Sequence, residues 1–391
     1  MASGASRIFT RARFPNRRPD NSPRRSVMGR VRCTDEKTKQ RIRGAIMSTA
    51  SPPTSPLTGA PAPDDDILRY RAPRWLPNSH AQTIVPALFA RRPVVAYRRE
   101  RWETPDHDFI DLDWVAHLDS AAPAPDAPLF VLFHGLEGSS GSHYALAMMA
   151  AARAKGWHAV VPHFRSCSGE INRQPRFYHL ADSAEVDWIL RRLAAQHRGP
   201  LVAAGVSLGG NVLLRWLGEH RSDTSILRAA AAISTPIDVH AGGRALSQGF
   251  AMVYTRSFLK TLKRKALAKL DQYPGLFDRE AMLQAVTMRD FDEVVTAPLH
   301  GFADADDYWT KATTRPLLPA IDVPTLILNA RNDPFLPESA LPGPADVSPA
   351  VELDQPAAGG HAGFMTGPFP GRLDWLSARV FGYCSKFVDH G

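Results

Sequence analysis

The sequence has few cysteines and no long apolar run, and these two absences narrow the classes of protein that it can encode. The three cysteines among its 391 residues, Cys33, Cys167 and Cys384, lie far apart and form no Cys-x-x-Cys pair. This spacing argues against a disulfide framework and against a cysteine zinc site, and it predicts a reducing, cytoplasmic compartment. No run of about 18 uninterrupted apolar residues is present, so no membrane-spanning helix is expected.

Composition and length favour a globular protein with a large core. Hydrophobic residues make up 44% of the chain and charged residues 22%, which are ordinary values for a folded domain. The same values argue against a wholly disordered or collagen-like chain. A chain of this length can bury a substantial core without disulfides.

Acidic residues are scarce at the beginning of the chain, and this scarcity explains the net charge of +8. Residues 1–47 contain 13 Lys or Arg but only three acids, Asp20, Asp35 and Glu36. This segment alone therefore carries +10, and the remaining 344 residues carry −2. The high isoelectric point belongs to the basic arm, and the rest of the chain is close to neutral.

The basic arm has almost no apolar periodicity, so residues 1–64 are expected to be disordered. Three interpretations stay open: binding of nucleic acid or anionic lipid, a targeting peptide without an apolar core, or an upstream extension with Met28 or Met47 as the true start. We favour the extension, or a plain disordered tail. Residues 48–64 are rich in Ser, Thr, Pro and Ala and predict a linker.

From about residue 65, short apolar runs alternate with longer helical patterns, which predicts an α/β fold with a mostly parallel sheet and crossover helices. Between residues 236 and 319 the strand rhythm stops and the pattern becomes irregularly helical. We therefore predict a cap or lid inserted there into a domain spanning 65–391. Strands are predicted at 128–133, 157–162, 201–206, 227–234, 325–329 and 351–353, and helices at 144–155, 182–196, 208–219 and 372–386.

The segment Gly205-Val-Ser-Leu-Gly209 fits the G-x-S-x-G pattern, and it lies between a predicted buried strand and a predicted helix. That context is the one in which the pattern forms a nucleophile elbow. The two glycines leave room for a tight turn, which presents the hydroxyl of Ser207 at the carboxyl end of the sheet. Ser207 is therefore the candidate nucleophile.

A serine nucleophile needs a base, and the base needs an acid that orients it. His361 is the candidate base, because it lies in a glycine-flanked loop between a short strand and the last helix. Asp333 is the candidate acid, because it follows the predicted strand 325–329. Asp238 stays open as the competitor, since it follows the preceding strand.

Two backbone N–H groups are needed to bind an oxyanion. Leu208, the residue after the nucleophile, is one candidate donor, and Leu136, in the loop after the strand 128–133, is the other. His134 in this loop is expected to be a packed, hydrogen-bonded residue. The acidic turn with Asp304, Asp306 and Asp307 lacks metal-ligand spacing, so no metal is expected there.

Together these residues resemble the YheT-type branch of the α/β-hydrolase superfamily. The resemblance covers nearly the whole folded part of the chain, from about residue 69 to the last helix. It rests on Trp75–Ile84 (WLPNSHAQTI), Asp108–Leu112 (DFIDL), His134–Gly138 (HGLEG), Gly205–Asn211 (GVSLGGN), Ala330–Pro334 (ARNDP) and Gly359–Gly363 (GGHAG).

The resemblance implies the α/β-hydrolase fold and a charge relay at Ser207, Asp333 and His361. The segment His163–Glu170 departs from the branch, with His163 and Ser166 in place of an asparagine and a glycine. The segment Tyr178–Ser183 lacks a glycine usual after its histidine. Cys167 lies within the first of these segments, and a packing role is expected for it because no histidine is placed to activate it.

We therefore predict a serine hydrolase that cleaves short- to medium-chain carboxylic esters, among them acylglycerols, through an acyl-enzyme. A thioesterase or acyltransferase with the same three residues is the nearest alternative, and a noncatalytic binding protein on the same scaffold is a second. No metal or organic cofactor is implied. The expected partner is a small-molecule ester. No specific nucleic acid is expected, and contact with a membrane surface and the oligomeric state stay open.

Overall fold

The computed structural model describes residues 69–117 and 121–388. The predicted basic arm and linker, residues 1–64, lie outside the described residues. Within the described part of the chain, eight strands form a single sheet in the order β1-β2-β4-β3-β5-β6-β7-β8. The strands are β1 (Tyr97–Glu103), β2 (Phe109–Val115), β3 (Leu129–Phe133), β4 (His158–Pro162), β5 (Leu201–Val206), β6 (Leu227–Ile233), β7 (Thr325–Leu328) and β8 (Val351–Asp354).

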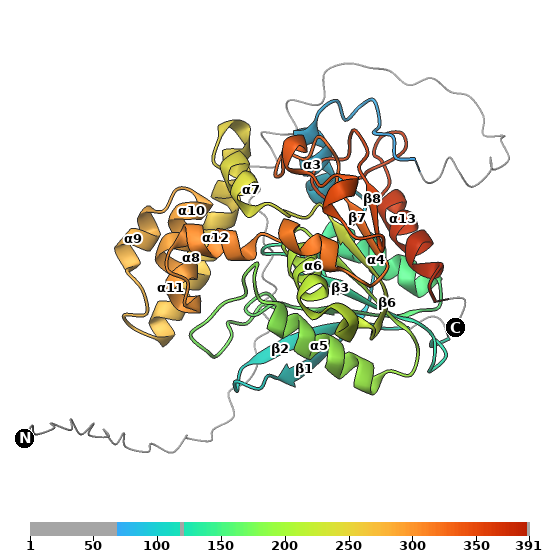
Figure 1. The fold of residues 1–391 in the computed structure, drawn as a ribbon, viewed down its shortest axis with the longest axis horizontal. Coiled ribbons are helices and arrows are strands. Elements are labelled where there is room, and N and C mark those ends of the chain that lie inside the picture. The colour runs from blue at the N-terminus through green and yellow to red at the C-terminus, as the bar shows by residue number, and fades with distance from the viewer. Residues whose placement is uncertain (1–68, 118–120, 389–391) are drawn as a thin grey trace, which may run out of the picture. The chain divides into compact units, whose positions relative to one another are not determined.

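The sheet is antiparallel at one edge and parallel elsewhere (Figure 1). Strand β2 pairs antiparallel with β1 and with β4, and every other neighbouring pair is parallel. The carboxyl ends of β3, β5, β6 and β7 therefore lie along one edge of the sheet. The α/β fold with a mostly parallel sheet, predicted from the sequence, is confirmed.

Helices cover both faces of this sheet and fill the segment between β6 and β7. Those that flank the sheet are α4 (His143–Ala154), α5 (Ser183–Gln196), α6 (Leu208–His220) and α13 (Asp374–Ser385), whereas α3 (Ser79–Phe89) contacts the loop that contains His361. Those between β6 and β7 are α7 (Val239–Leu246), α8 (Met252–Gln272), α9 (Arg279–Gln284), α10 (Met288–Phe291), the π-helix η3 (Asp292–Thr296), α11 (Ala297–His300) and α12 (Ala305–Ala312). Short 3-10 helices are η1 (Arg221–Thr224), η2 (Gly249–Ala251), η4 (Arg315–Ala320), η5 (Glu338–Ala340) and η6 (Pro344–Asp346).

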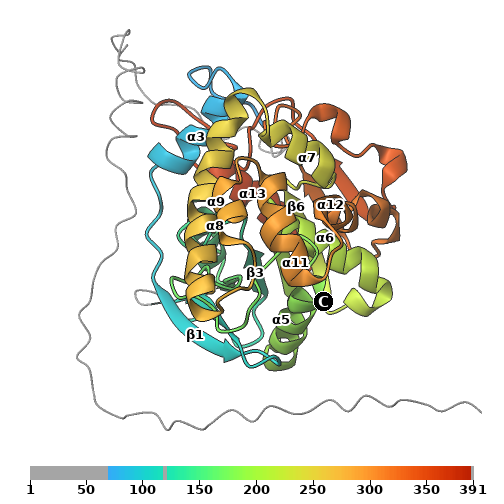
Figure 2. The ribbon, with the colours of Figure 1, turned by 90° about the vertical axis from the view of Figure 1, so that its left-hand side faces the viewer.

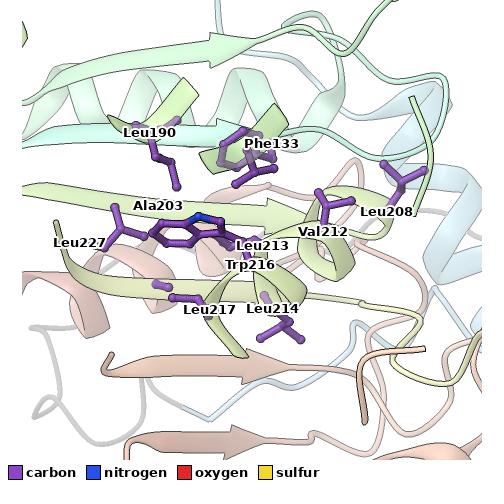
Figure 3. Packing of buried hydrophobic residues seen from close by; sticks show 14 of the residues in the cluster. Phe133, Leu190, Ala203, Leu208, Val212, Leu213, Leu214, Trp216, Leu217 and Leu227 are labelled. Carbon is purple, nitrogen blue, oxygen red and sulfur yellow. The ribbon is translucent and has the colours of Figure 1, made fainter. Parts of the chain in front are cut away.

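The central strands β3 and β5 are apolar along their whole length and are buried on both faces. Along β3, Val131 and Phe133 pack towards α5 and α6, whereas Phe130 and Leu132 pack towards α4 and α13. Figure 3 shows the first of these two layers, with the indole of Trp216 among the aliphatic side chains of α6 and the sheet. The central helix α6, which begins directly after Ser207, is therefore anchored firmly against the sheet.

Helices α8 to α12 lie to one side of the sheet, and α8, α9 and α10 share a small apolar core (Figures 1 and 2). This core includes Leu259 and Ala266 of α8, Met282 of α9 and Phe291 of α10. The segment coincides with the break in strand rhythm at residues 236–319. None of the helices in the described residues has the length and apolar character needed to cross a membrane.

Candidate active site

Ser207 lies in the sharp turn between β5 and α6, and its backbone is strained. Its φ is 54° and its ψ is −119°, which is rare for a residue with a side chain. The N–H of Ser207 donates to the carbonyl of Ile233 at the end of β6 over 2.8 Å. This bond fixes the turn at the carboxyl edge of the sheet, where the sequence places a nucleophile.

The two glycines of the turn are required by close approach of the backbone. A Cβ atom on Gly205 would lie 2.3 Å from the carbonyl oxygen of Gly209. A Cβ atom on Gly209 would lie 2.3 Å from the carbonyl oxygen of Phe133, at the end of β3. Both clashes involve backbone atoms, which cannot move aside without disturbing β3 or the beginning of α6.

His361 and Asp333 form a hydrogen-bonded pair beside this turn. The Nδ1–H of His361 donates to Oδ2 of Asp333 over 2.9 Å, and the side chain of Asp333 is fully buried. The ring of Phe335 stacks on the imidazole with a centroid distance of 3.9 Å and an interplanar angle of 15°. The carboxylate and the stacked ring hold the imidazole in one orientation, with Nε2 on the side opposite the acid.

The structure brings Asp333, and not Asp238, to the histidine. The carboxylate of Asp238 accepts a hydrogen bond from the N–H of Ala241 over 2.8 Å and so caps the beginning of α7. The acids of the turn near 304 also have local partners. Asp304 caps α12, Asp306 pairs with Arg289, and Asp307 pairs with Lys311.

The loop with His361 is supported by α3, a role that the sequence analysis missed. Thr83 Oγ1 accepts a hydrogen bond from the N–H of His361 over 2.9 Å. Gln82 Oε1 accepts from the N–H of Gly359 and from the side-chain amide of Asn332, each over 2.9 Å. Both residues belong to the segment Trp75–Ile84, on which the resemblance to the YheT-type branch partly rests. The resemblance therefore marked this segment, but no feature of the local sequence indicated that it supports the histidine loop.

The two candidate oxyanion donors lie at the wall of one cavity with Ser207 and His361. Among the described residues, no protein acceptor is bonded to the backbone N–H of Leu136 or of Leu208. The loop around Leu136 is held by two tyrosines. The hydroxyl of Tyr144 accepts from the N–H of Gly135, and that of Tyr178 accepts from the N–H of Glu137, each over 2.8 Å.

His134 is fully buried and hydrogen-bonded within this loop. Its Nδ1–H donates to the carbonyl of Gly135 over 2.8 Å, and its Nε2 accepts from the N–H of Phe164 over 3.1 Å. Burial, with a smaller contribution from His163, lowers the pKa of His134 to about 3, so the ring is neutral. These contacts support the predicted packing role.

The segment His163–Glu170, whose sequence departs from that of the YheT-type branch, is also held by hydrogen bonds. The Nε2–H of His163 donates to Asp113 over 2.9 Å, and the hydroxyl of Ser166 donates to Asn172 over 2.6 Å. Burial raises the pKa of the Cys167 thiol to about 11, because the thiolate would be poorly solvated. A thiol with so high a pKa is a poor nucleophile, which supports the expected packing role.

The cavity at Ser207 has a volume of about 130 Å³ and is enclosed mainly by apolar side chains. One wall comes from the sheet edge and the other from helices α7, α8, α10 and α12. An ion pair lies in the wall between these two parts, where Lys265 Nζ of α8 is 2.6 Å from Glu137 Oε1. The exposed fractions of these two side chains are only 13% and 9%.

A second buried acid lies on the far wall of the cavity. Asp292, the first residue of the π-helix η3, accepts from the indole N–H of Trp309 over 2.8 Å and from the hydroxyl of Thr296 over 2.6 Å. Burial raises the pKa of this carboxyl group to about 6. Its two partners occupy both oxygens, so this acid holds the cavity wall together.

Comparison with known proteins gives consistent results. Residues 128–368 match the model of the α/β-hydrolase fold family. The chain is 39% identical over 319 residues to YheT of Escherichia coli (strain K12), covering 81% of this chain and 93% of that protein. It is 31% identical over 322 residues to the mouse phospholipase ABHD3, covering 81% and 78%.

A third relative is the medium-chain fatty acid ethyl ester synthase/esterase 2 of Saccharomyces cerevisiae. The identity is 28% over 292 residues, covering 67% of this chain and 63% of that protein. The relatives share an esterase and lipase type of chemistry, and the family model covers the site described above. The chain therefore belongs to the α/β-hydrolase superfamily, in the YheT-type branch, and is an enzyme of the esterase and lipase type.

Proposed function

We propose that this enzyme is a serine hydrolase that cleaves carboxylic esters through an acyl-enzyme, with Ser207, His361 and Asp333 as its catalytic residues. The observation that carries the proposal is that His361, which is hydrogen-bonded to Asp333 over 2.9 Å, lines the same cavity as Ser207. The strained turn at Ser207 supports it, because strain of this kind persists where the surrounding structure imposes it, commonly at active sites.

In the first half of the reaction, the hydroxyl oxygen of Ser207 attacks the ester carbonyl carbon while Nε2 of His361 takes the hydroxyl proton. Asp333 stabilises the imidazolium that forms. The N–H groups of Leu136 and Leu208 stabilise the oxyanion, since no protein acceptor among the described residues competes for them. The imidazolium then gives its proton to the leaving alcohol as the ester bond breaks.

In the second half, His361 takes a proton from water as the water oxygen attacks the acyl-enzyme. The tetrahedral intermediate collapses, the acid leaves, and Ser207 regains its proton from His361. An alcohol in place of water would give transesterification with the same residues. The synthase/esterase name of the yeast relative supports keeping this acyltransferase activity as the second candidate.

The cavity supports an acyl group of short to medium length. An apolar cavity of about 150 Å³ is known to hold a benzene molecule. The 130 Å³ found here would thus enclose an acyl group of about six carbons, with longer groups extending along its mouth. We propose that residues 236–319 form the cap over this cavity, and that the enzyme acts in the cytoplasm, which the cysteine usage favours.

The test is intact-mass labelling of wild type and Ser207→Ala with a fluorophosphonate, together with hydrolysis of a series of p-nitrophenyl esters. We expect one adduct on wild type, none on the variant, and a loss of turnover of at least about 10⁴-fold. Labelling of Ser207→Ala, or turnover that survives in it, would exclude Ser207 as the nucleophile. Addition of an alcohol acceptor separates the two candidate functions, because an acyltransferase forms new ester faster than free acid.

A further inference from the structure

Helix α8 carries a concentrated positive charge on its exposed side. Residues 239–270 contain seven Lys or Arg and no Asp or Glu. Three of these cations, Arg256, Lys260 and Arg264, are exposed and follow one another at intervals of four residues, so they form a single stripe along the helix. We call these three residues the α8 stripe. None of them has an ion pair or a side-chain hydrogen bond to another described residue.

An exposed apolar tip lies at the beginning of the same helix. Phe250 of η2 is 53% exposed and Val253 of α8 is 47% exposed. Figure 2 shows α8 along its length on the face of the molecule towards the viewer. The apolar face of α8 packs against its neighbouring helices, so the exposed surface combines the cations of the stripe with the two apolar side chains of the tip. Basic residues beside exposed large apolar side chains fit an anionic bilayer, where cations meet head groups and apolar side chains enter the interface.

The apolar tip is connected to the proposed active site by a row of aromatic rings. The Phe250 ring lies 6.3 Å from that of Tyr254, which lies 4.8 Å from Phe335. Phe335 in turn stacks on His361, and both line the cavity. A row of packed aromatic rings therefore links the tip to the wall of the cavity.

We propose that the α8 stripe and the tip formed by Phe250 and Val253 dock this enzyme on an anionic lipid surface. The charge of the stripe complements anionic head groups, and the exposed apolar side chains can enter the interface. The chain's own residues 1–47 are excluded as the occupant because they carry +10, the same sign as the stripe. A nucleic acid would satisfy the charge but would leave the apolar tip in water. This inference does not depend on which residue is the nucleophile.

The first experiment measures binding of the full-length chain to vesicles of phosphatidylcholine alone and of equal parts phosphatidylcholine and phosphatidylglycerol. The test variant is Arg256→Gln/Lys260→Gln/Arg264→Gln. The matched control is Lys155→Gln/Arg198→Gln/Arg228→Gln, which removes three exposed cations near the amino ends of β4, β5 and β6, away from the carboxyl edge. Both variants keep the basic arm and have the same net charge, so the arm contributes equally to both.

We expect wild type and the control variant to bind the anionic vesicles alike, and neither to bind phosphatidylcholine well. The test variant should bind the anionic vesicles roughly a hundredfold more weakly, because three basic side chains leave the interface. Equal loss in the two variants would overturn the proposal, since total charge rather than the stripe would then explain the binding.

The second experiment locates the contact. An environment-sensitive fluorophore is attached to Ser257→Cys on α8, or to Ala195→Cys on α5 as a control, each in a Cys33→Ser background. We expect a blue shift on anionic vesicles for the label at position 257 and none at position 195. No shift at 257, together with binding of RNA that needs the stripe, would overturn lipid docking in favour of nucleic acid.

Two further measurements separate this proposal from the proposed function. The test variant should hydrolyse a soluble p-nitrophenyl ester at the wild-type rate, because the stripe does not line the cavity. Ser207→Ala should bind anionic vesicles as wild type does. A stripe variant that loses turnover of the soluble ester would contradict a role restricted to docking.

Discussion

The loops at the carboxyl edge of the sheet and the helices between β6 and β7 form opposite walls of one cavity, but they are held in different ways. At the sheet edge, backbone atoms hold the turn that carries the nucleophile, through the N–H of Ser207 with Ile233 and the close approach of Gly209 to Phe133. Across the cavity, side chains make the contacts, such as the Lys265–Glu137 pair and the indole of Trp309 on Asp292.

This difference indicates that the sheet edge positions the catalytic groups and that the opposite wall shapes the space for the substrate. Backbone contacts tolerate almost no change, so the geometry of the proposed chemistry is fixed by the sheet. Apolar side chains can be exchanged at modest cost when volume is kept, so the apolar part of the opposite wall can vary to suit the substrate.

Gly209→Ala should have the largest effect, because its Cβ would clash with the backbone of β3. We expect a loss of about 3 kcal/mol in unfolding free energy and at least roughly a hundredfold in turnover. Denaturant unfolding measures the change in unfolding free energy, and ester hydrolysis measures the change in turnover. The control is Gly382→Ala in α13, where an added Cβ meets nothing within 4 Å. A Gly209→Ala enzyme with normal turnover would contradict the rigid sheet edge.

Thr83→Val removes the acceptor for the N–H of His361 and keeps the shape of the side chain. We expect kcat to fall roughly tenfold with KM nearly unchanged, because the imidazole loses part of its positioning and not its contact with substrate. Thr261→Val, whose hydroxyl bonds only within α8, is the control. A change in KM alone would argue against this supporting role for α3.

Lys265→Met breaks the ion pair between α8 and the loop that carries Leu136, and leaves the carboxylate of Glu137 buried without its cation. We expect a severalfold loss of kcat. Adding Glu137→Gln should restore part of it, because removing both partners of a buried pair costs less than removing one. Steady-state kinetics of the two single variants and the double variant complete the cycle. A double variant worse than both single variants would disprove the coupling.

Gly243→Ala tests the opposite wall of the cavity. The added Cβ would lie 2.2 Å from the outer edge of the Trp309 indole, a side chain rather than backbone, so the ring can shift. We expect the fold to survive and kcat/KM for the longest accepted acyl esters to fall roughly tenfold relative to short ones. The chain-length profile of p-nitrophenyl esters measures this. An equal loss of kcat/KM for all chain lengths would contradict a role of Gly243 in shaping the acyl site.

Acidification should lower stability through four buried histidines. Burial depresses the pKa of His134, His179 and His300 to about 3 and that of His143 to about 4. Below about pH 6.5 the unfolded chain takes up protons at these histidines, whereas the folded chain does not. Protonation therefore stabilises the unfolded chain, and the unfolding free energy falls as the pH falls below that value. We expect Tm to decline from pH 7 to pH 5, and His134→Asn should flatten that decline. A Tm that rises over this range would contradict the four assignments.

Much of the site was predictable because its signals are local. The turn at Ser207 needs a buried strand, two small residues and a helix in immediate succession, and these are adjacent in the sequence. Chain order and flanking glycines were enough to favour His361. The predicted strand 201–206 agrees with β5 to the residue, and the other predicted strands differ by one residue at an end. Apolar runs bounded by turn residues mark these six strands, but not β1 (Tyr97–Glu103) and β2 (Phe109–Val115), in which charged residues interrupt the run.

Long-range contacts could not be predicted in the same way. Nothing in the segment around Asp238 shows that its carboxylate is used to cap α7, and nothing near Gln82 and Thr83 shows that they support a loop almost 280 residues later. Such contacts depend on how helices and strands pack in three dimensions, which a local sequence pattern does not determine.

The sequence by itself determined which residue types could act and where the chain turns, because backbone sterics and apolar periodicity operate over a few neighbouring residues. Only the tertiary structure decided which acid meets His361, which side chains close the cavity, and that the cations of α8 share one exposed stripe. These are properties of surfaces brought together by folding, and their distances become defined only when the sheet and its helices have packed.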